Sequence, residues 1–210
     1  MKHMLEIQKD WEYQSVIGID EVGRGPLAGP VVSCAFLLND VAKLPQQITD
    51  SKKLSSPKRQ RFNEFLTANF DYAIGIKSNE EIDQINILQA TYAAMRDAYN
   101  NLEEKIDLNA ESSPIILIDG RDNPLKSAKI ASQSIIKGDS KSYAIASASI
   151  IAKVFRDKLM AELAVKYPQY GWERNAGYGT KEHIAAILKY GLTPYHRRSF
   201  TKKLKAHNDE

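Results

Sequence analysis

Acidic residues follow two short apolar runs of this 210-residue chain, at the point where each run ends. Asp20 and Glu21 come directly after residues 16–19, and Asp119 comes directly after residues 115–118. If the two runs are neighbouring parallel strands, these ends share one edge of a sheet, where α/β proteins place their ligands. Carboxylates gathered there repel one another and have raised pKa values unless a cation holds them. Oxygen ligands without a His or Cys cluster predict Mg²⁺ or Mn²⁺, and not zinc.

A fourth carboxylate candidate, Asp139, lies just after the next apolar run. These acids also have structural explanations that the sequence leaves open. Asp119 is followed by Gly120, and Asp-Gly is an ordinary turn sequence. Asp139 could instead cap the long helix expected after it.

Two short segments near the first acids could contact phosphate. Gly23 and Gly25 would let the backbone come close to a ligand, while Arg24 between them supplies a cation. A tight turn without any ligand is the alternative explanation. Lys52 and Lys53 lie beside a predicted helix start, where ammonium groups and backbone amides could both face phosphate, although a solvated cap explains them equally well.

The aromatic residues that we considered fall into two groups. Tyr178 lies in the glycine-rich turn 175–180, where its ring has no obvious core to fill, so it could stack on a nucleotide. Tyr92, Tyr99 and Phe155 recur at helical spacing and are expected in the core.

Charge favours an anionic partner without proving one, because the net charge of +3 arises from 29 basic and 26 acidic residues. Basic residues gather in the stretch 189–205, which includes Arg197 and Arg198 and is either a phosphate-binding patch or a solvated tail. The lone Cys34 can form no internal disulfide. No apolar run approaches the roughly 20 residues of a membrane helix, and the first residues lack the apolar segment of a signal peptide. We therefore expect a cytoplasmic protein that does not bind membranes.

The elements that must position these residues follow the pattern of an α/β protein. Strands are expected at 16–20, 30–38, 72–76, 115–119 and 133–136, and helices at 58–70, 86–102, 143–167 and 181–190. Strands first in succession and later alternating with helices predict a sheet that is part antiparallel and part parallel.

Seven motifs, in this order, resemble those of the ribonuclease HII family. They are GIDEVGRGPLAGP (18–30), DSKKL (50–54), IDG (118–120), KGDS (137–140), ASASIIAKV (146–154) with RD (156–157), GYGT (177–180) and HRRSF (196–200). The resemblance implies a ribonuclease H-like fold, with a five-stranded mixed sheet flanked by helices. It also implies a single catalytic domain over residues 1–210, with a core at about 15–165 and a helical, substrate-binding C-terminal appendage at about 166–210.

The same resemblance implies an endonuclease that hydrolyses the RNA strand of RNA–DNA hybrids and cuts 5′ of single ribonucleotides in duplex DNA. Two divalent ions, Mg²⁺ or Mn²⁺, would act in each active site of a monomer, giving 3′-hydroxyl and 5′-phosphate ends. The residues that match the family's catalytic and metal-binding carboxylates are Asp20, Glu21, Asp119 and Asp139. The residues expected to bind the substrate are Gly23, Arg24, Gly25, Lys52, Lys53, Tyr178, Arg197 and Arg198.

Within this resemblance, Gly23, Arg24 and Gly25 match the motif that senses the ribose 2′-hydroxyl. Tyr178 matches the tyrosine that stacks on the sugar of the following deoxynucleotide. Asp157 is expected to act as helix-borne support and not as a metal ligand.

Two other functions compete with this interpretation. A non-catalytic nucleic-acid-binding module would use the basic residues but would leave the acids unexplained, because carboxylates repel a polyanion unless metal is present. Another nuclease of the same fold, such as a Holliday-junction resolvase, would share the acids but need no ribose-sensing turn. The four histidines offer no pair beside the carboxylates, which argues against a metal-independent ribonuclease, and His196 is expected to shape the basic C-terminal surface.

Overall fold

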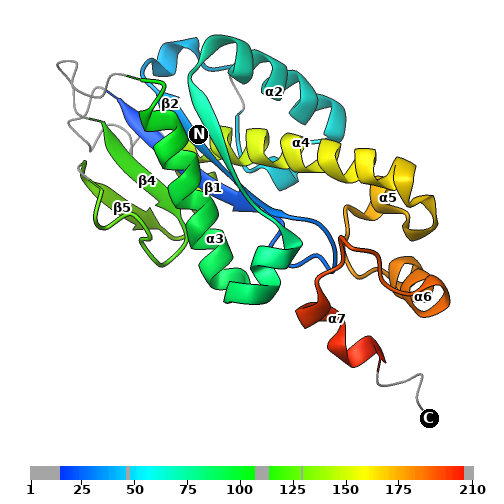
Figure 1. The fold of residues 1–210 in the computed structure, drawn as a ribbon. Helices are drawn as coiled ribbons and strands as arrows, with labels where there is room; N and C mark the ends of the chain where they lie inside the picture. The colour runs from blue at the N-terminus through cyan, green and yellow to red at the C-terminus, as the bar shows by residue number, and fades with distance from the viewer. Residues whose placement is uncertain (1–14, 46–47, 107–113, 129, 206–210) are drawn as a thin grey trace.

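The computed structural model describes residues 15–45, 48–106, 114–128 and 130–205. These residues form a five-stranded sheet with helices on both faces (Figure 1). The strands are β1 (Val16–Val22), β2 (Val31–Leu38), β3 (Tyr72–Lys77), β4 (Ile115–Asp119) and β5 (Ser132–Ile135). Their spatial order is β3-β2-β1-β4-β5, in which β1, β2 and β3 pair antiparallel while β4 and β5 run parallel to β1. The predicted mixed sheet is therefore confirmed.

The long helices cover the sheet from opposite sides. They are α2 (Ser56–Asn69), α3 (Asn79–Glu103) and α4 (Tyr143–Lys166). Successive strand residues point to opposite faces, so Ile17 and Ile19 pack with α3 while Val16 packs with α2 and α4. Gly18 lies between them, and a Cβ there would be 2.1 Å from the backbone of Ala144, so only glycine lets α4 come this close to β1.

Two helix starts differ in an informative way from the sequence-based expectations. α3 begins at Asn79 and kinks at Asn86, which has φ 65° and whose side chain accepts hydrogen bonds from the next turn. The expected helix from residue 86 is the second half of this element. The N-cap of α4 is Ser142, whose side chain accepts from the backbone N–H of Ile145, so the alternative role of Asp139 as the cap is wrong.

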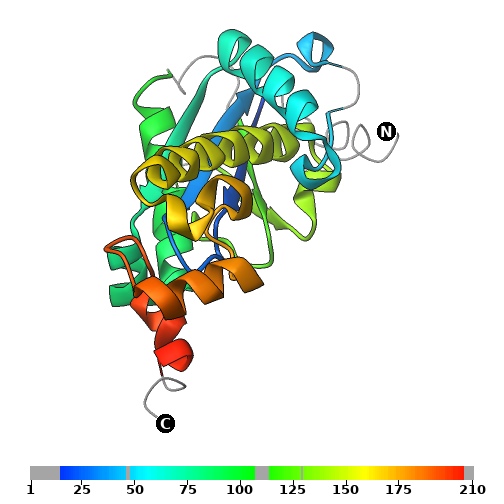
Figure 2. The same ribbon diagram turned by 90° about the vertical axis from the view of Figure 1, so that its right-hand side faces the viewer.

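The C-terminal segments lie together beyond the end of α4 (Figure 2). They are η4 (Pro168–Tyr170), α5 (Trp172–Asn175), α6 (Lys181–Tyr190) and α7 (Arg198–Lys205). Backbone hydrogen bonds join them to the β1–β2 connection, including Leu27 N–H to Gly177 O at 2.8 Å and Gly29 N–H to Tyr195 O at 2.9 Å. The turn that follows the first acids is thus held by the C-terminal region.

Three single-turn 3₁₀ helices complete the described structure: η1 (Val41–Lys43), η2 (Ser51–Lys53) and η3 (Gly138–Ser140). In the described part of the chain, no helix combines the length and apolar character needed to cross a bilayer.

Candidate active site

The carboxyl ends of β1 and β4 bring two acids side by side. The parallel pairing of these strands ends at Ile19 and Ile118, and the next residues are Asp20 and Asp119. β1 continues to Val22, so its acids lie inside the strand and not directly after it as expected. The longer strand does not separate the acids, because the parallel register still aligns them.

Asp20 is almost completely buried, with 4% of its surface exposed. Its Oδ1 accepts a hydrogen bond from the Glu21 N–H at 2.7 Å, and Ser149 of α4 is a second partner of the carboxyl group. Burial raises the pKa of Asp20 well above its ordinary value, and the charges of Glu21 and Asp119 raise it further.

The negative charge of Glu21 is partly compensated by an arginine from the turn that follows it. Burial raises the pKa of Glu21, while the Arg24 guanidinium, 3.4 Å from Glu21 Oε1, lowers it and Asp119 raises it again. The net shift is upward, so this compensation is incomplete.

Asp139 reaches the same edge through η3. The Gly138 N–H donates to Asp119 Oδ1 at 2.6 Å. A Cβ on Gly138 would lie 2.5 Å from Ile145 Cδ1, so the absence of a side chain allows this approach. Asp139 is 9% exposed, and burial raises its pKa together with the charges of Asp119 and Asp50.

Lys52 faces these acids from η2. Burial lowers the pKa of Lys52, but the carboxylates around it, first Asp20 and then Asp139, raise it above its ordinary value overall. Ser51 Oγ lies 2.9 Å from Ser149 Oγ, which ties η2 to α4 beside Asp20. Lys52 therefore offsets part of the acidic charge.

We call the end of the sheet that carries Asp20, Glu21, Asp119 and Asp139 the acidic edge. It has the chemistry of a site for a hard divalent cation. Its donors are carboxylate oxygens, the ligand type of Mg²⁺ and Mn²⁺. Burial raises the pKa values of Asp20, Glu21 and Asp139, and repulsion from neighbouring carboxylates raises them further, so a bound cation would stabilise the charged forms. Within the described residues, no three His, Cys, Asp or Glu side chains converge into a complete ion site. The donor set thus fits such a cation.

The turn formed by Gly23, Arg24 and Gly25, hereafter the glycine turn, is fixed from behind by a buried arginine. Gly23 has φ 96°, a conformation that side chains disfavour. Arg197 donates hydrogen bonds to the carbonyl oxygens of Gly23, Arg24 and Gly29 at 2.5, 2.9 and 3.0 Å. Because Arg197 is 0% exposed, its expected contact with phosphate is wrong for this structure. Its guanidinium positions the glycine turn instead.

A second buried arginine repeats this arrangement. Arg156 is 0% exposed and donates to the carbonyl oxygens of Pro30, Ala28 and Ala176 at 2.9, 3.1 and 2.9 Å. Burial lowers the pKa of Arg156 to about 10, and burial with the nearby charge of Arg156 lowers that of Arg197 to about 9. Sequence analysis gave no role to Arg156, because nothing local shows which carbonyl groups surround a cation.

The other predicted substrate-binding side chains remain accessible. Arg24, Lys53 and Arg198 are exposed, so their expected phosphate contacts stay predictions. Tyr178 is 44% exposed, and its Cε1 lies 3.4 Å from the position that a Cβ on Gly25 would take. The structure therefore brings Tyr178 to the glycine turn, which is far from it in the sequence.

A buried hydrogen-bonded chain holds the backbone of Tyr178. His196 Nδ1 accepts from the Thr193 N–H at 2.9 Å, which assigns the proton to Nε2, 3.1 Å from His183 Nε2. Trp172 Nε1 donates to the same His183 nitrogen at 3.0 Å, so His183 Nε2 is an acceptor. His183 therefore carries its proton on Nδ1, which donates to Tyr178 O at 2.9 Å. Both imidazoles are neutral in this arrangement.

The burial of these histidines corrects one prediction and supplies residues that the sequence missed. His196 is 1% exposed, so it does not shape the C-terminal surface. Burial lowers the pKa of His183, and burial together with His183 lowers that of His196 to about 4. Trp172 and His183 belong to none of the recognised motifs. We call this set of buried residues the C-terminal latch: Arg156, Trp172, His183, His196 and Arg197.

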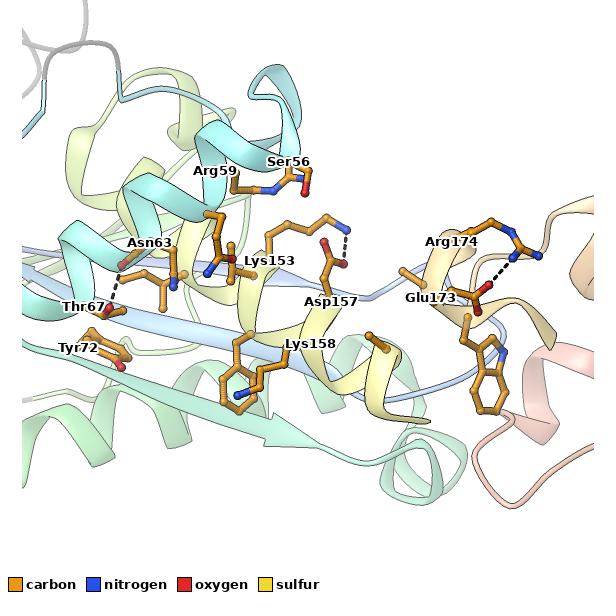
Figure 3. Close-up of a pocket in the computed structure, with 17 residues that line it drawn as sticks. Ser56, Arg59, Asn63, Thr67, Tyr72, Lys153, Asp157, Lys158, Glu173 and Arg174 are labelled. Atoms are coloured by element: carbon orange, nitrogen blue, oxygen red, sulfur yellow. Dashed lines mark hydrogen bonds and ion pairs between the residues drawn. The ribbon is translucent and has the colours of Figure 1, made fainter. Parts of the chain in front are cut away.

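A cavity of about 830 Å³ lies away from the acids (Figure 3). It runs between α2, α4 and α5, and none of the four candidate carboxylates lines it. Its wall includes the ion pair of Lys153 and Asp157, whose atoms are 2.6 Å apart. Asp157 thus contacts a neighbour on its own helix, which fits the supporting role expected of it.

A smaller cavity of about 370 Å³ opens directly beside Glu21 and Asp119. Tyr92 of α3 lines this cavity and is partly exposed, whereas Tyr99 on the same helix is 3% exposed. The prediction that both rings belong to the core is therefore wrong for Tyr92.

Comparison with known proteins agrees with this geometry. The family model for ribonuclease HII matches residues 17–203. Ribonuclease HII of Rickettsia akari (strain Hartford) is 49% identical over 197 residues, which are 94% of this chain and 96% of the relative. The crystal structure of ribonuclease H2 from Pyrococcus horikoshii OT3 superposes with a TM-score of 0.76 at 25% identity, covering 93% of this chain and 99% of the other.

A third comparison supports the fold alone. Bst-RNase HIII in complex with Mn²⁺ superposes with a TM-score of 0.76 at 21% identity, covering 92% of this chain and 70% of the other. The matches in sequence extend over nearly the whole chain and include both the acidic edge and the glycine turn. The chain therefore belongs to the ribonuclease HII family, whose members are endonucleases that degrade RNA in RNA–DNA hybrids.

Proposed function

We propose that this chain, besides degrading the RNA strand of hybrids, cuts on the 5′ side of a single ribonucleotide embedded in duplex DNA. The observation that carries the proposal is the continuity of the acidic edge with the glycine turn, which begins two residues after Glu21. A phosphate bound at Asp20 and Asp119 would have its neighbouring ribose beside Gly23 and Gly25. Such an activity would serve the removal of ribonucleotides from DNA.

The four acids Asp20, Glu21, Asp119 and Asp139 would hold two ions of Mg²⁺ or Mn²⁺, and a structural neighbour carries Mn²⁺ in its crystal. When bound, the ions supply the Lewis acidity that activates water and stabilises the leaving 3′-oxygen, giving 3′-hydroxyl and 5′-phosphate ends. Without positive charge at this edge the carboxylates would repel the phosphates of the substrate. Lys52 supplies part of that charge from the protein itself.

The glycine turn would distinguish RNA from DNA by contacting the ribose 2′-hydroxyl, the group that separates the two sugars. Backbone at Gly23 and Gly25 carries no side chain that would keep a sugar at a distance. Arg197 holds the carbonyl groups of Gly23 and Arg24 in place, so the turn would be preorganised for this contact. Tyr178 would then pack on the sugar of the following deoxynucleotide.

The C-terminal region, residues 166–210, would act as a substrate-binding appendage of one catalytic domain. Exposed cations such as Lys53 and Arg198 would contact phosphates along the duplex. We further propose that the protein works as a cytoplasmic monomer.

Two alternatives make different predictions. A non-catalytic binding module would have no need of three acids with raised pKa values in one place. A junction-resolving nuclease would need the acids but no locked glycine turn beside them. Ribose dependence of cleavage separates both from the proposal.

The test uses matched duplexes: all-DNA, DNA with one ribonucleotide, and an RNA–DNA hybrid, each with Mg²⁺, Mn²⁺ or excess chelator. We expect cleavage of the second and third only, on the 5′ side of the single ribonucleotide, and no cleavage in chelator. Asp119→Asn is the matched inactive control. Cleavage of all-DNA at a similar rate, or failure to cut the single-ribonucleotide duplex, would overturn the proposal.

A further inference from the structure

The cavity beside Glu21 and Asp119 has features that neither carboxylate chemistry nor ribose recognition explains. Residues of α3, of the segment after β4 and of the segment after β5 line its other walls. We call it the α3 pocket and define it by Leu88, Tyr92, Met95, Arg121, Asp122 and Ile136. Its volume of about 370 Å³ lies in the range of sites that bind small chemical groups.

Tyr92 is held in one orientation on the wall of this pocket. Its hydroxyl donates to Asp122 Oδ2 at 2.5 Å, and the carbonyl oxygen of Asp122 accepts from Ser134 Oγ at 2.6 Å. These bonds connect α3 through the segment after β4 to β5. The ring therefore presents a fixed face beside the acids, which reduces the entropy lost on binding.

Apolar side chains on the same wall are unusually accessible. Leu88 is 39% exposed and Ile136 is 55% exposed, and both line the α3 pocket. Exposed apolar groups that surround a cavity next to a reactive site favour an occupant with an apolar surface. The carbon-bound hydrogens of a sugar ring provide such a surface.

The charges that line the pocket are mixed and nearly balanced. Glu21, Asp119 and Asp122 contribute three carboxylates, whereas Arg24 and Arg121 contribute two guanidinium groups. Arg121 is exposed and makes no hydrogen bond or ion pair with the described residues. A neutral sugar fits inside, with its phosphate remaining close to the arginines.

The position of the pocket selects one sugar of the substrate strand. Tyr178 lies against Gly25, and the proposed function assigns to it the sugar of the nucleotide after the ribose. The α3 pocket opens at Glu21 and Asp119, where the cleaved phosphate would bind. We propose that the α3 pocket receives the deoxyribose immediately upstream of the cleaved phosphodiester, while its base remains paired in the duplex.

This inference rests on the proposed function and adds a second sugar contact to it. Tyr92 and Tyr178 would hold the sugars on the two sides of the cleaved site, which restricts the position of the phosphate between the acids. Positioning of this kind lowers the barrier without any change in the reacting groups.

The experiment changes the upstream nucleotide in two ways within a single-ribonucleotide duplex. A tetrahydrofuran abasic unit keeps the sugar ring and removes the base, whereas a propanediol linker removes both. We expect wild-type protein to cut the abasic duplex nearly as well as the natural one. The propanediol duplex should lose about tenfold more in kcat/KM, the size of one lost ring contact.

The variants locate this loss in the protein. In Ile136→Ala and Tyr92→Ala the difference in kcat/KM between the abasic and the propanediol duplex should shrink to less than about threefold. The altered leaving group of the propanediol duplex affects every protein equally, so the comparison between proteins isolates the pocket. Ile76→Ala is the matched control, because Ile76 is 40% exposed on β3 and does not line the pocket.

The outcomes separate this inference from the proposed function. If wild-type protein fails to cut the natural single-ribonucleotide duplex, the proposed function is wrong. If it cuts that duplex but treats the two altered duplexes alike, the sugar contact does not exist. If both pocket variants keep the full difference, as Ile76→Ala should, the contact lies elsewhere and the α3 pocket is not its site. Ile136→Ala, at a largely exposed position, serves alone if Tyr92→Ala does not fold.

Discussion

At the acidic edge of the sheet, carboxylates lie close together with charges that are only partly compensated, whereas in the C-terminal latch buried cations are surrounded by acceptors. Asp20 is buried among like charges. Arg197, which is equally inaccessible, donates to three backbone carbonyl groups. The two regions meet at the glycine turn, which follows the acids and is held by the latch.

The difference shows how one fold can combine a site whose charges are incompletely compensated with a rigid support. Burying charge costs free energy unless partners replace the lost water. The latch has these partners within the protein, so it can hold backbone atoms in fixed positions. The partners at the acidic edge compensate its charges only in part, so a cation and a substrate phosphate gain free energy by binding there.

The largest expected effect comes from removing one charge of the acidic edge. Asp119→Asn should reduce cleavage by at least about a thousandfold, because a neutral amide binds a divalent ion poorly. Its stability should stay equal or rise, because the amide oxygen can still accept from Gly138 and a repulsive charge is gone. Cleavage rates and thermal unfolding of the metal-free protein measure both. A variant that is inactive only because it is unfolded would contradict this view of the edge.

The opposite result is expected in the latch. Arg197→Ala should lower the free energy of unfolding by about 3 kcal/mol, because three buried carbonyl groups lose a charged donor. Chemical denaturation measures this change. Arg198→Ala is the neighbouring control at an exposed position and should change stability by less than about 0.5 kcal/mol. Equal stability of the two variants would show that Arg197 is not a structural support.

The effect of pH should have opposite signs in the two regions. Burial and His183 lower the pKa of His196 to about 4, below the value of about 6.5 for an unfolded histidine. The unfolded chain therefore binds more protons between pH 4 and 6.5, and the latch loses stability as the pH falls through that range. The raised pKa of Asp20 makes the folded state bind more protons, so the metal-free edge gains stability on acidification.

Unfolding free energies of metal-free protein between pH 7 and pH 5 test these signs. His196→Gln should lose less stability on acidification than wild type, because no imidazole at this position then has to stay neutral. Asp20→Asn should lose more, because the compensating gain at the edge is removed. Parallel pH profiles for all three proteins would contradict both assignments.

The acidic edge could be predicted from sequence because it depends on local pattern. Asp20 and Asp119 directly follow apolar runs of the sequence, and the parallel register of β1 and β4 then places them together. Tyr92 could not be assigned in this way, because helical spacing gives the face of α3 but not where the helix passes the edge of the sheet.

The latch and α7 depend on contacts between distant parts of the chain. Arg197 satisfies carbonyl groups more than 160 residues before it, so its sequence neighbours give no sign of its burial. The expected exposure of Arg197 was wrong for this reason, whereas Arg198 beside it is exposed. α7 begins where Asp83 accepts hydrogen bonds from the N–H groups of Arg198 and Ser199 at 2.8 and 2.9 Å. Its helix start is thus supplied by a residue from α3, and no local cap predicts it.

The smallest expected effect concerns an exposed cation outside both regions. Lys53 is exposed in η2 beside Lys52, which faces the acids, and Lys53 should contact one phosphate of the duplex. Lys53→Ala should weaken binding to all duplex sequences and reduce the slope of log K against log salt by about 1. Binding assays from 50 to 200 mM salt, in Ca²⁺ or chelator so that no cleavage occurs, measure the slope. Lys43→Ala is the control, because that side chain is 64% exposed and pairs with Asp40. If both variants keep the wild-type slope, Lys53 belongs to the solvated surface and does not contact the duplex.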